Sequence, residues 1–388
     1  MDDSSRILGG WILGQLTVLD LYSGCGGLSL GFEMTGAYRI VGGVDSFPWA
    51  VKSFYANHPR ACSLLAKTVD LGSVTGDHLL GALKRRPDLI VGGPPCQGFS
   101  KAGRRTGVDS RNQEVWNFQR IVGDLQPKAF VMENVDGLLT TGQQQRGELR
   151  LELERGFEKI RYRTYSALLD AVDYRVPQRR KRLIMVGIRG VDRPFCFPPP
   201  LTGDTRNLFA PVEPIATVAD ALADLPTPIA SEPQPYDKDP MTWLQLLLRE
   251  DSETLHEHTP SKHSPEMVRR LTAQPIATRL YPNWNHSWYK LDPARPSPAV
   301  KENHRAPFVH FAEPRVTTPR ECARLQTFPD RYRILGTKTA QLIQVGNAVP
   351  ALLAATVATA LAAALGADSE VSRPNGLPRL ASQMTAGA

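Results

Sequence analysis

Residues 16–32 read LTVLDLYSGCGGLSLGF, and this stretch decides the fold class of the chain. It opens with an apolar run typical of a buried strand, Leu16–Tyr22, and continues directly into a glycine-rich turn. Glycines at the end of a strand let the backbone turn tightly and approach a ligand closely. Ser29 stands where the dinucleotide-binding fingerprint G-x-G-x-x-G has its third glycine. We therefore expect a ligand-binding turn whose ligand carries no pyrophosphate.

After this turn, short apolar runs alternate with segments of helical pattern. Together these segments predict an α/β fold, a doubly wound and mostly parallel sheet covered by helices on both faces. Ligands of such sheets bind at the carboxyl ends of the strands, so the residues that follow each strand are the candidate site. The further strands are expected at Arg39–Val44, Asp88–Val91 and Lys128–Glu133, and helices at Trp49–Asn57 and Gln113–Leu125.

The regular pattern weakens in the second half of the chain. Residues 188–298 are rich in Pro, Trp and His and show few periodic runs, which indicates an inserted smaller domain. Residues 338–365, with an Ala- and Leu-rich helix at Ala351–Leu365, return to the first domain. The expected organisation is a catalytic and cofactor-binding domain at 1–187, the insert at 188–298, a hinge segment at 299–337, the return at 338–365 and a disordered tail at 366–388.

The composition excludes several classes of protein. No apolar run reaches the roughly 18–20 residues of a membrane span, and the start of the chain is acidic, so we expect a cytoplasmic protein without a signal peptide. Five cysteines without a Cys-x-x-Cys pair predict neither a disulfide framework nor a zinc knuckle. The net charge of +7 suits a polyanionic partner.

Two carboxylates lie in register with the glycine turn. Asp45 ends the second strand about 20 residues after the turn, where an acidic side chain accepts hydrogen bonds from ribose hydroxyls. Asp70, which follows an expected third strand, can accept a hydrogen bond from the exocyclic amine of adenine. The alternative is a plain turn between a strand and a helix, with two surface carboxylates; the joint pattern favours a nucleoside-type cofactor.

The chemistry-bearing residues follow the next two strands. A Gly-Gly-Pro-Pro loop presents Cys96, and residues 101–111 after it carry four basic side chains against one acidic. Nearby cations lower the pKa of a thiol, and a loop of this charge can close over phosphates. Glu133 ends the following strand, where partial burial would raise its pKa and let it act as an acid.

Five motifs appear in an order that closely resembles the bacterial DNA (cytosine-5)-methyltransferases. The resemblance covers the chain from about Thr17 to Leu365, except for the insert. The motifs are Gly93–Gln97, Glu133–Val135, Pro177–Arg182, Arg320–Gln326 and Gln344–Pro350.

The resemblance implies a mechanism. C5 of cytosine is too weak a nucleophile to attack the methyl group of S-adenosylmethionine unless a thiolate, here Cys96, first adds to C6. Glu133 would donate to N3 and Arg182 would bind O2, while Arg180 would support the geometry of the catalytic loop. S-adenosylhomocysteine is the expected product, and no metal is expected. His256, His258 and His263 lack the cysteines or carboxylates that would complete a metal site.

The same resemblance assigns binding residues. Tyr22 would stack near the adenine, although the family more often has Phe there, and Asn347 would knit the last helix to the cofactor strand. The cofactor residues are Tyr22, Ser23, Gly24, Gly26, Gly27, Asp45, Asp70, Pro94 and Asn347. The DNA-binding residues are Gln97, Ser100, Lys101, Arg104, Arg105 and Gln178.

The implied partner is double-stranded DNA, from which the target base must be flipped out. The insert would then recognise the target sequence, and its candidate readers are Arg269, Arg270, Arg279, Asn283, Asn285 and Lys290, each of which is more often a plain surface residue. A companion restriction endonuclease and a monomeric state are also expected.

Three rival functions remain open. A transfer-RNA cytosine-5 methyltransferase would carry a Cys-Phe-Thr signature, whereas Cys196-Phe197 is followed by Pro198. An exocyclic amino-methyltransferase needs an Asp/Asn/Ser-Pro-Pro-aromatic tetrapeptide and has no use for a thiol. A catalytically silent DNA-binding regulator would have no need to retain all three of Cys96, Glu133 and Arg182.

Overall fold

The computed structural model describes residues 14–95, 113–139, 147–190, 194–205, 212–283, 288–301 and 308–367. All structural statements below concern these residues. Seven of the side chains named above lie outside the described residues, namely Cys96, Gln97, Ser100, Lys101, Arg104, Arg105 and Asn285.

The centre of the fold is a six-stranded sheet in the order β2-β1-β3-β4-β6-β5. β1 to β4 are parallel, and β6 runs antiparallel to both of its neighbours, so the predicted doubly wound, mostly parallel sheet is confirmed. The strands and helices that were predicted with explicit residue ranges agree with the observed ones to within one residue at each end. The strands are β1 Leu16–Leu21, β2 Tyr38–Val44, β3 Leu89–Gly92, β4 Ala129–Asn134, β5 Arg163–Asp170 and β6 Lys181–Ile188.

One expected strand is absent from its predicted place. The residues before Asp70 form the 3-10 turn η1, Ser63–Leu65, and an irregular stretch, and Asp70 caps a second turn, η2, Leu71–Ser73. Residues 66–68 are exposed, and on either side of them single backbone hydrogen bonds join Cys62 to Val41 of β2 and Val69 to Asp45 after it. It buries too little apolar surface to extend the sheet.

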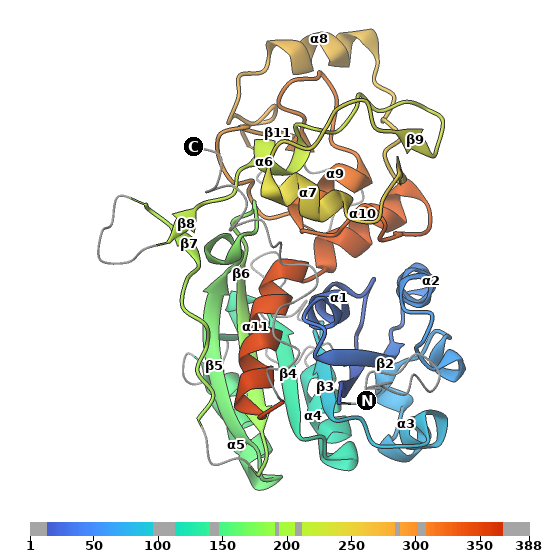
Figure 1. Cartoon of the computed structure of the whole chain (residues 1–388), viewed down its shortest axis with the longest axis vertical. Helices are drawn as coiled ribbons and strands as arrows, with labels where there is room; N and C mark the ends of the chain where they lie inside the picture. The colour runs from blue at the N-terminus through green and yellow to red at the C-terminus, as the bar shows by residue number, and fades with distance from the viewer. Residues whose placement is uncertain are drawn as a thin grey trace, which may run out of the picture.

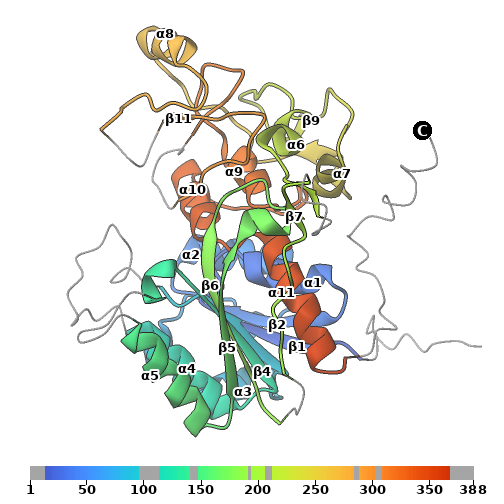
Figure 2. The same ribbon diagram turned by 90° about the vertical axis from the view of Figure 1, so that its left-hand side faces the viewer.

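Helices cover both faces of the sheet because side chains alternate along each strand. Leu19, Ile90 and Phe130 pack on one face against α3, α4 and α5. Val18, Val91 and Val131 belong to the core of the opposite face, which α1, α2 and α11 cover. Figure 2 shows α3–α5 on one side of the sheet and α1 with α11 on the other. These helices are α1 Gly27–Met34, α2 Pro48–Asn57, α3 Gly76–Leu83, α4 Gln113–Leu125, α5 Glu148–Lys159 and α11 Ala351–Ala364.

The last described helix packs closely on the first. A Cβ atom on Gly31 of α1 would lie 2.4 Å from Cβ of Ala354 and 2.5 Å from the carbonyl oxygen of Ala351, both in α11. The hydroxyl of Tyr38 donates to the carbonyl of Ala358 at 2.8 Å. The stretch Lys338–Ala364 is long and apolar enough to cross a membrane, and 72% of its apolar window is buried inside this fold.

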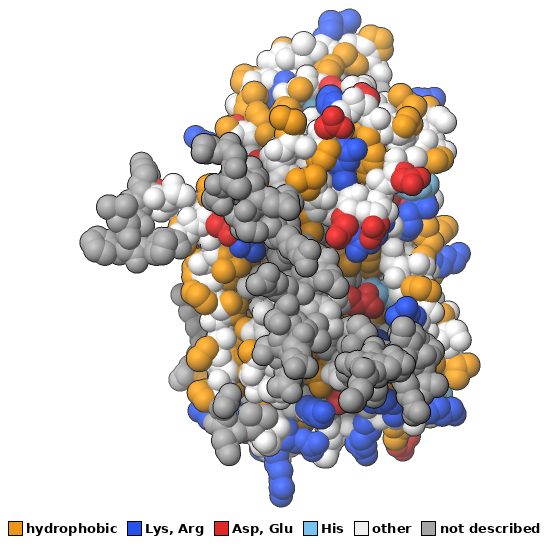
Figure 3. Space-filling view, viewed as in Figure 1, with side chains coloured by type: hydrophobic (Ala, Val, Ile, Leu, Met, Phe, Trp, Pro, Cys, Tyr) orange, Lys and Arg blue, Asp and Glu red, His pale blue; other side chains and the backbone are white. Residues whose placement is uncertain are grey.

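A smaller, irregular part of the chain lies above the sheet in Figure 1. Its core is continuous with that of the α1 face through residues such as Leu244, Leu248 and Leu255. Figure 3 shows its basic and acidic side chains interspersed on this face rather than gathered in one patch. Its elements are β7 Thr202–Gly203, β8 Glu213–Pro214, α6 Val218–Leu222, β9 Gln234–Pro235, α7 Trp243–Arg249, β10 Thr254–Leu255, α8 Pro265–Ala273, β11 Tyr289–Lys290, β12 Phe308–Val309, α9 Pro319–Leu325 and α10 Lys338–Asn347. Two further 3-10 turns follow strands of the sheet, η4 Asp136–Leu139 after β4 and η5 Ala171–Tyr174 after β5.

Candidate active site

The glycine-rich turn, residues 22–27, connects β1 to α1 at the carboxyl edge of the sheet. Gly24 and Gly26 adopt φ values of 55° and 95°, which lie in the left-handed region that glycine tolerates best. Asp45 holds the turn, since its Oδ2 accepts from the amide of Gly24 at 2.8 Å and its Oδ1 from that of Phe47 at 2.7 Å. Burial raises the pKa of Asp45. A Cβ on Gly24 would meet nothing within 4 Å, so this turn borders open space.

α1 begins immediately after this turn with no side chain capping its first residues. The first amides of a helix lack intrahelical acceptors, and they favour an anionic group that lies close to them. Ser29, the residue in the place of the third glycine, donates from Oγ to Oδ2 of Asp20 at 2.6 Å. Burial raises the pKa of Asp20 to about 7. Both residues belong to the stretch that decides the fold class, but the hydrogen bond between them was not predicted.

Tyr22 follows β1, and Asp70 caps the turn η2. The hydroxyl of Tyr22 donates to Oε2 of Glu114 on α4 at 2.7 Å, and burial raises the pKa of this tyrosine. Asp70 is exposed, and its Oδ1 accepts from the amide of Gly72 at 2.9 Å. Glu114 fixes the tyrosine ring and was missed by sequence reasoning, since a glutamate near a helix start reads as an ordinary capping residue.

The candidate catalytic residues gather at the end of β4. Glu133 is 9% exposed, and its Oε1 lies 2.5 Å from Nε of Arg182 on the neighbouring strand β6. Asn134 joins β4 to the loop after β3, because its Nδ2 donates to the carbonyl of Pro94 at 3.3 Å. A Cβ on Gly93 would lie 3.0 Å from Oε2 of Glu133. The structure thus brings Glu133, Arg182 and the loop that leads to Cys96 together.

Arg180 lies beneath this group and is fully enclosed. Its guanidinium donates to the carbonyls of Val300 at 2.6 Å and Gly346 at 2.8 Å, while its amide donates to Oδ1 of Asp170 at 2.9 Å. Burial holds the pKa of Arg180 well below its ordinary value. The side chain therefore joins β6 to two segments from the last third of the chain.

Gln178 does not lie where we expected a DNA-contacting residue. It is 0% exposed; its Nε2 donates to the carbonyl of Leu325 at 3.0 Å and to Oε1 of Gln326 at 3.1 Å, and its Oε1 accepts from the amide of Val300 at 2.8 Å. The amide is committed to these internal bonds, so in this structure it joins segments of the protein and is inaccessible to DNA.

Two further expectations are corrected in the same way. Lys290 is buried and its Nζ donates to the carbonyls of Leu271 and Gln274 at 3.2 and 3.0 Å, so it caps the end of α8 instead of reading DNA. Asn347 is exposed at the end of α10 and does not knit this region together. Gln326 instead joins the end of α9 to α10, because its Nε2 donates to the carbonyl of Val345 at 2.8 Å.

The remaining candidate readers Arg269, Arg270, Arg279 and Asn283 are exposed. Two of the three histidines make internal hydrogen bonds: His258 lies between Oγ1 of Thr318 and the carbonyl of Pro226, and His263 accepts from the amide of Val316. Among the described residues, no group of three or more potential metal ligands comes together.

The sequence profile of the C-5 cytosine-specific DNA methylases matches residues 16–363. The chain belongs to this family. The resemblance inferred from the motif order is confirmed, and the protein is a DNA (cytosine-5-)-methyltransferase. Membership of the family implies S-adenosylmethionine as the methyl donor.

Relatives extend along most of the chain. Type II methyltransferase M1.HphI of Haemophilus parahaemolyticus is 34% identical over 89% of this chain and 87% of its own length. Type II methyltransferase M.XorII of Xanthomonas oryzae is 34% identical over 95% of this chain and 89% of its own. Among solved structures, a candidate DNA modification methyltransferase encoded within a prophage, from E. coli, superposes with a TM-score of 0.74 at 29% identity over 91% of this chain and 100% of that one.

Proposed function

We propose that this methyltransferase moves the methyl group of S-adenosylmethionine to C5 of one specific, flipped-out cytosine in double-stranded DNA through a covalent bond between Cys96 and C6. The observation that best supports this mechanism is the Glu133–Arg182 pair at the carboxyl edge of the sheet. It lies against the loop at Gly93 and Pro94, and Cys96 follows Pro94 by two residues.

In the proposed reaction the thiolate of Cys96 adds to C6 and turns the ring into an enamine. C5 then takes the methyl group from the sulfonium, and S-adenosylhomocysteine is released. Water takes the C5 proton, the C6–S bond breaks to restore the thiolate and the aromatic ring, and N3 returns its proton to Glu133. Glu133 donates a proton to N3, and Arg182 donates a hydrogen bond to O2, so both oppose the negative charge that develops on the ring. Arg180 would support the geometry of the catalytic loop, and its bonds to the carbonyls of Val300 and Gly346 hold its own side chain in place.

The residues of the glycine-rich turn fit the methyl donor. The uncapped start of α1 offers amide donors to a carboxylate, and the carboxylate of Asp45 keeps lone pairs for the ribose hydroxyls after binding two amides. Tyr22, held by Glu114, would stack on the adenine, whose amine would donate to Asp70. Ser23, Gly24, Gly26, Gly27, Pro94 and Asn347 complete the proposed donor site.

We further propose that residues 188–298 form the target-recognition domain and that the enzyme belongs to a restriction-modification system. The similarity to proteins named Type II methyltransferases supports this role. In this proposal the exposed side chains Arg269, Arg270, Arg279 and Asn283 contact base edges. The enzyme would act as a monomer on DNA in the cytoplasm, beside a companion endonuclease.

The deciding experiment incubates the purified protein with labelled S-adenosylmethionine and unmethylated plasmid, with transfer RNA in parallel. Bisulfite sequencing of the plasmid then maps 5-methylcytosine. We expect modified cytosines in one short recurring sequence of the plasmid. Label in the RNA alone would replace this proposal by a transfer-RNA methyltransferase, and label in neither would indicate a catalytically silent DNA-binding protein.

A further inference from the structure

Three side chains from separate segments form a chain of polar contacts beside the glycine-rich turn. The hydroxyl of Tyr332 donates to the carbonyl of Cys25 at 2.6 Å, and Nε2 of His58 lies 3.2 Å from the same hydroxyl. Nδ1 of His58 lies 2.8 Å from Oε2 of Glu33 on α1. His58 and Tyr332 are only 3% and 4% exposed, so solvent has little access to the contact between them, whereas Glu33 is partly exposed.

The turn rests directly on this chain. A Cβ on Gly26 would lie 2.4 Å from the hydroxyl of Tyr332 and 3.0 Å from Nε2 of His58, so there is no free space between them. The single hydroxyl hydrogen of Tyr332 goes to the carbonyl of Cys25, so the hydroxyl oxygen stays free to accept from Nε2 of His58 in the tautomer that carries its hydrogen there. Burial raises the pKa of Tyr332 well above its ordinary value, which keeps the hydroxyl protonated as a donor.

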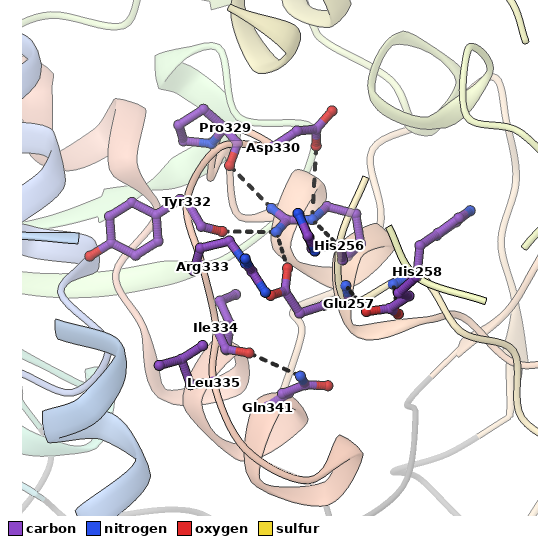
Figure 4. A network of polar contacts seen from close by, with 12 residues as sticks. His256, Glu257, His258, Pro329, Asp330, Tyr332, Arg333, Ile334, Leu335 and Gln341 are labelled. Carbon is purple, nitrogen blue, oxygen red and sulfur yellow. Dashed lines mark hydrogen bonds and ion pairs between the residues drawn. The ribbon is translucent and has the colours of Figure 1, made fainter. Parts of the chain in front are cut away.

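Tyr332 belongs to the segment Pro329–Leu335, which hydrogen bonds hold on two sides. The guanidinium of Arg320 donates to two carbonyls of this segment, those of Pro329 at 3.1 Å and Tyr332 at 2.8 Å. Figure 4 shows the Tyr332 ring pointing away from Asp330 and Glu257. On the other side, the amide of Asn57 donates to the carbonyl of Arg333 at 2.7 Å and accepts from its N–H at 2.8 Å. The hydroxyl therefore has little freedom to leave the carbonyl of Cys25.

We propose that Tyr332 and His58 are positioning residues that hold the glycine-rich turn in the conformation that binds S-adenosylmethionine. This inference rests on the proposed placement of the donor at that turn. The bond to Cys25 fixes the peptide between Cys25 and Gly26, and with it the direction of the first amides of α1. Without the hydroxyl, a buried carbonyl loses its partner and the turn relaxes toward other conformations. Donor binding then weakens, while the reacting groups at Glu133 are untouched.

The test compares Tyr332→Phe with Tyr38→Phe. Both variants delete a buried hydroxyl that donates to a backbone carbonyl, but the Tyr38 bond joins β2 to α11 and does not touch the turn. Calorimetry gives the Kd for S-adenosylhomocysteine, and steady-state assays on plasmid give KM for the donor and kcat. We expect Tyr332→Phe to raise Kd and KM about tenfold with kcat within twofold, and Tyr38→Phe to change each by less than twofold.

An Asp45→Ala arm separates this inference from the proposed donor site. If Asp45→Ala weakens donor binding but Tyr332→Phe acts no more strongly than Tyr38→Phe, the positioning role is refuted and the donor site stands. If Asp45→Ala leaves Kd unchanged, the donor is misplaced and both proposals fall. Should Tyr332→Phe fail to fold, His58→Gln decides: a several-fold rise in KM supports the inference, and an unchanged KM or a fall in kcat alone refutes it.

Discussion

Replacement of Gln178 by Ala tests whether this residue supports the fold, as the structure indicates, or binds DNA, as its motif suggested. The change removes three internal hydrogen bonds, to Leu325, Gln326 and Val300. At about 1 kcal/mol for each bond, the free energy of unfolding falls by about 3 kcal/mol. For a chain of this size a loss of 1 kcal/mol lowers Tm by about 2 °C, so we expect Tm to fall by about 6 °C.

Thermal unfolding followed by circular dichroism measures the stability of the variant, and fluorescence anisotropy with a target duplex, well below both melting temperatures, measures its DNA affinity. Gln245→Ala is a matched control, because Gln245 is equally buried and bonds to Ala219, Met241 and Thr242 within the smaller part. Both variants should lose stability and keep their DNA affinity within threefold. A Gln178→Ala variant with unchanged Tm and a tenfold loss of DNA affinity would refute this reasoning.

Three further predictions concern catalysis, recognition and pH. Cys96→Ser should abolish methyl transfer and Glu133→Gln should slow it by on the order of 10²–10⁴-fold in single-turnover assays with labelled donor; turnover by the first, or a loss below tenfold in the second, would contradict the mechanism. Exchange of residues 188–298 for those of a relative should change the DNA sequence that is methylated, as mapped by bisulfite sequencing. An unchanged sequence would mean that the residues that recognise it lie outside 188–298. Burial raises the pKa of Asp20 to about 7 from 3.8, so the folded state binds the proton more tightly and stability falls as pH rises from about 4 to about 7. In Asp20→Asn, Tm should depend less on pH across that window than in the unchanged protein. An equal dependence of Tm on pH in both proteins would exclude Asp20 as the cause.

The sequence predicts the sheet well and the contacts of polar side chains poorly. β1 and β4 are recognisable because apolar runs of strand length end in turn residues, and this pattern depends only on local order along the chain. Arg182 lies at the start of β6, which runs antiparallel to β4, so its contact with Glu133 depends on a strand pairing that was not predicted. Whether Gln178 is buried or Asn347 exposed depends on which distant segment covers them, and no local pattern carries that information. The Tyr332–Cys25 bond joins residues about 300 positions apart, and it becomes visible only in the folded chain.

The packing of α11 on α1 has a consequence for the order of synthesis. α1 leaves the ribosome about 300 residues before α11, which at about 5–20 residues per second is a delay of roughly 15–60 seconds. During that time the face of α1 around Gly31, which later meets Ala351 and Ala354, has no partner from α11. The start of the same helix forms part of the proposed donor site. A nascent chain therefore completes the support of its proposed methyl-donor site only after α11 has emerged, so catalytic competence is not acquired before that helix has been synthesised.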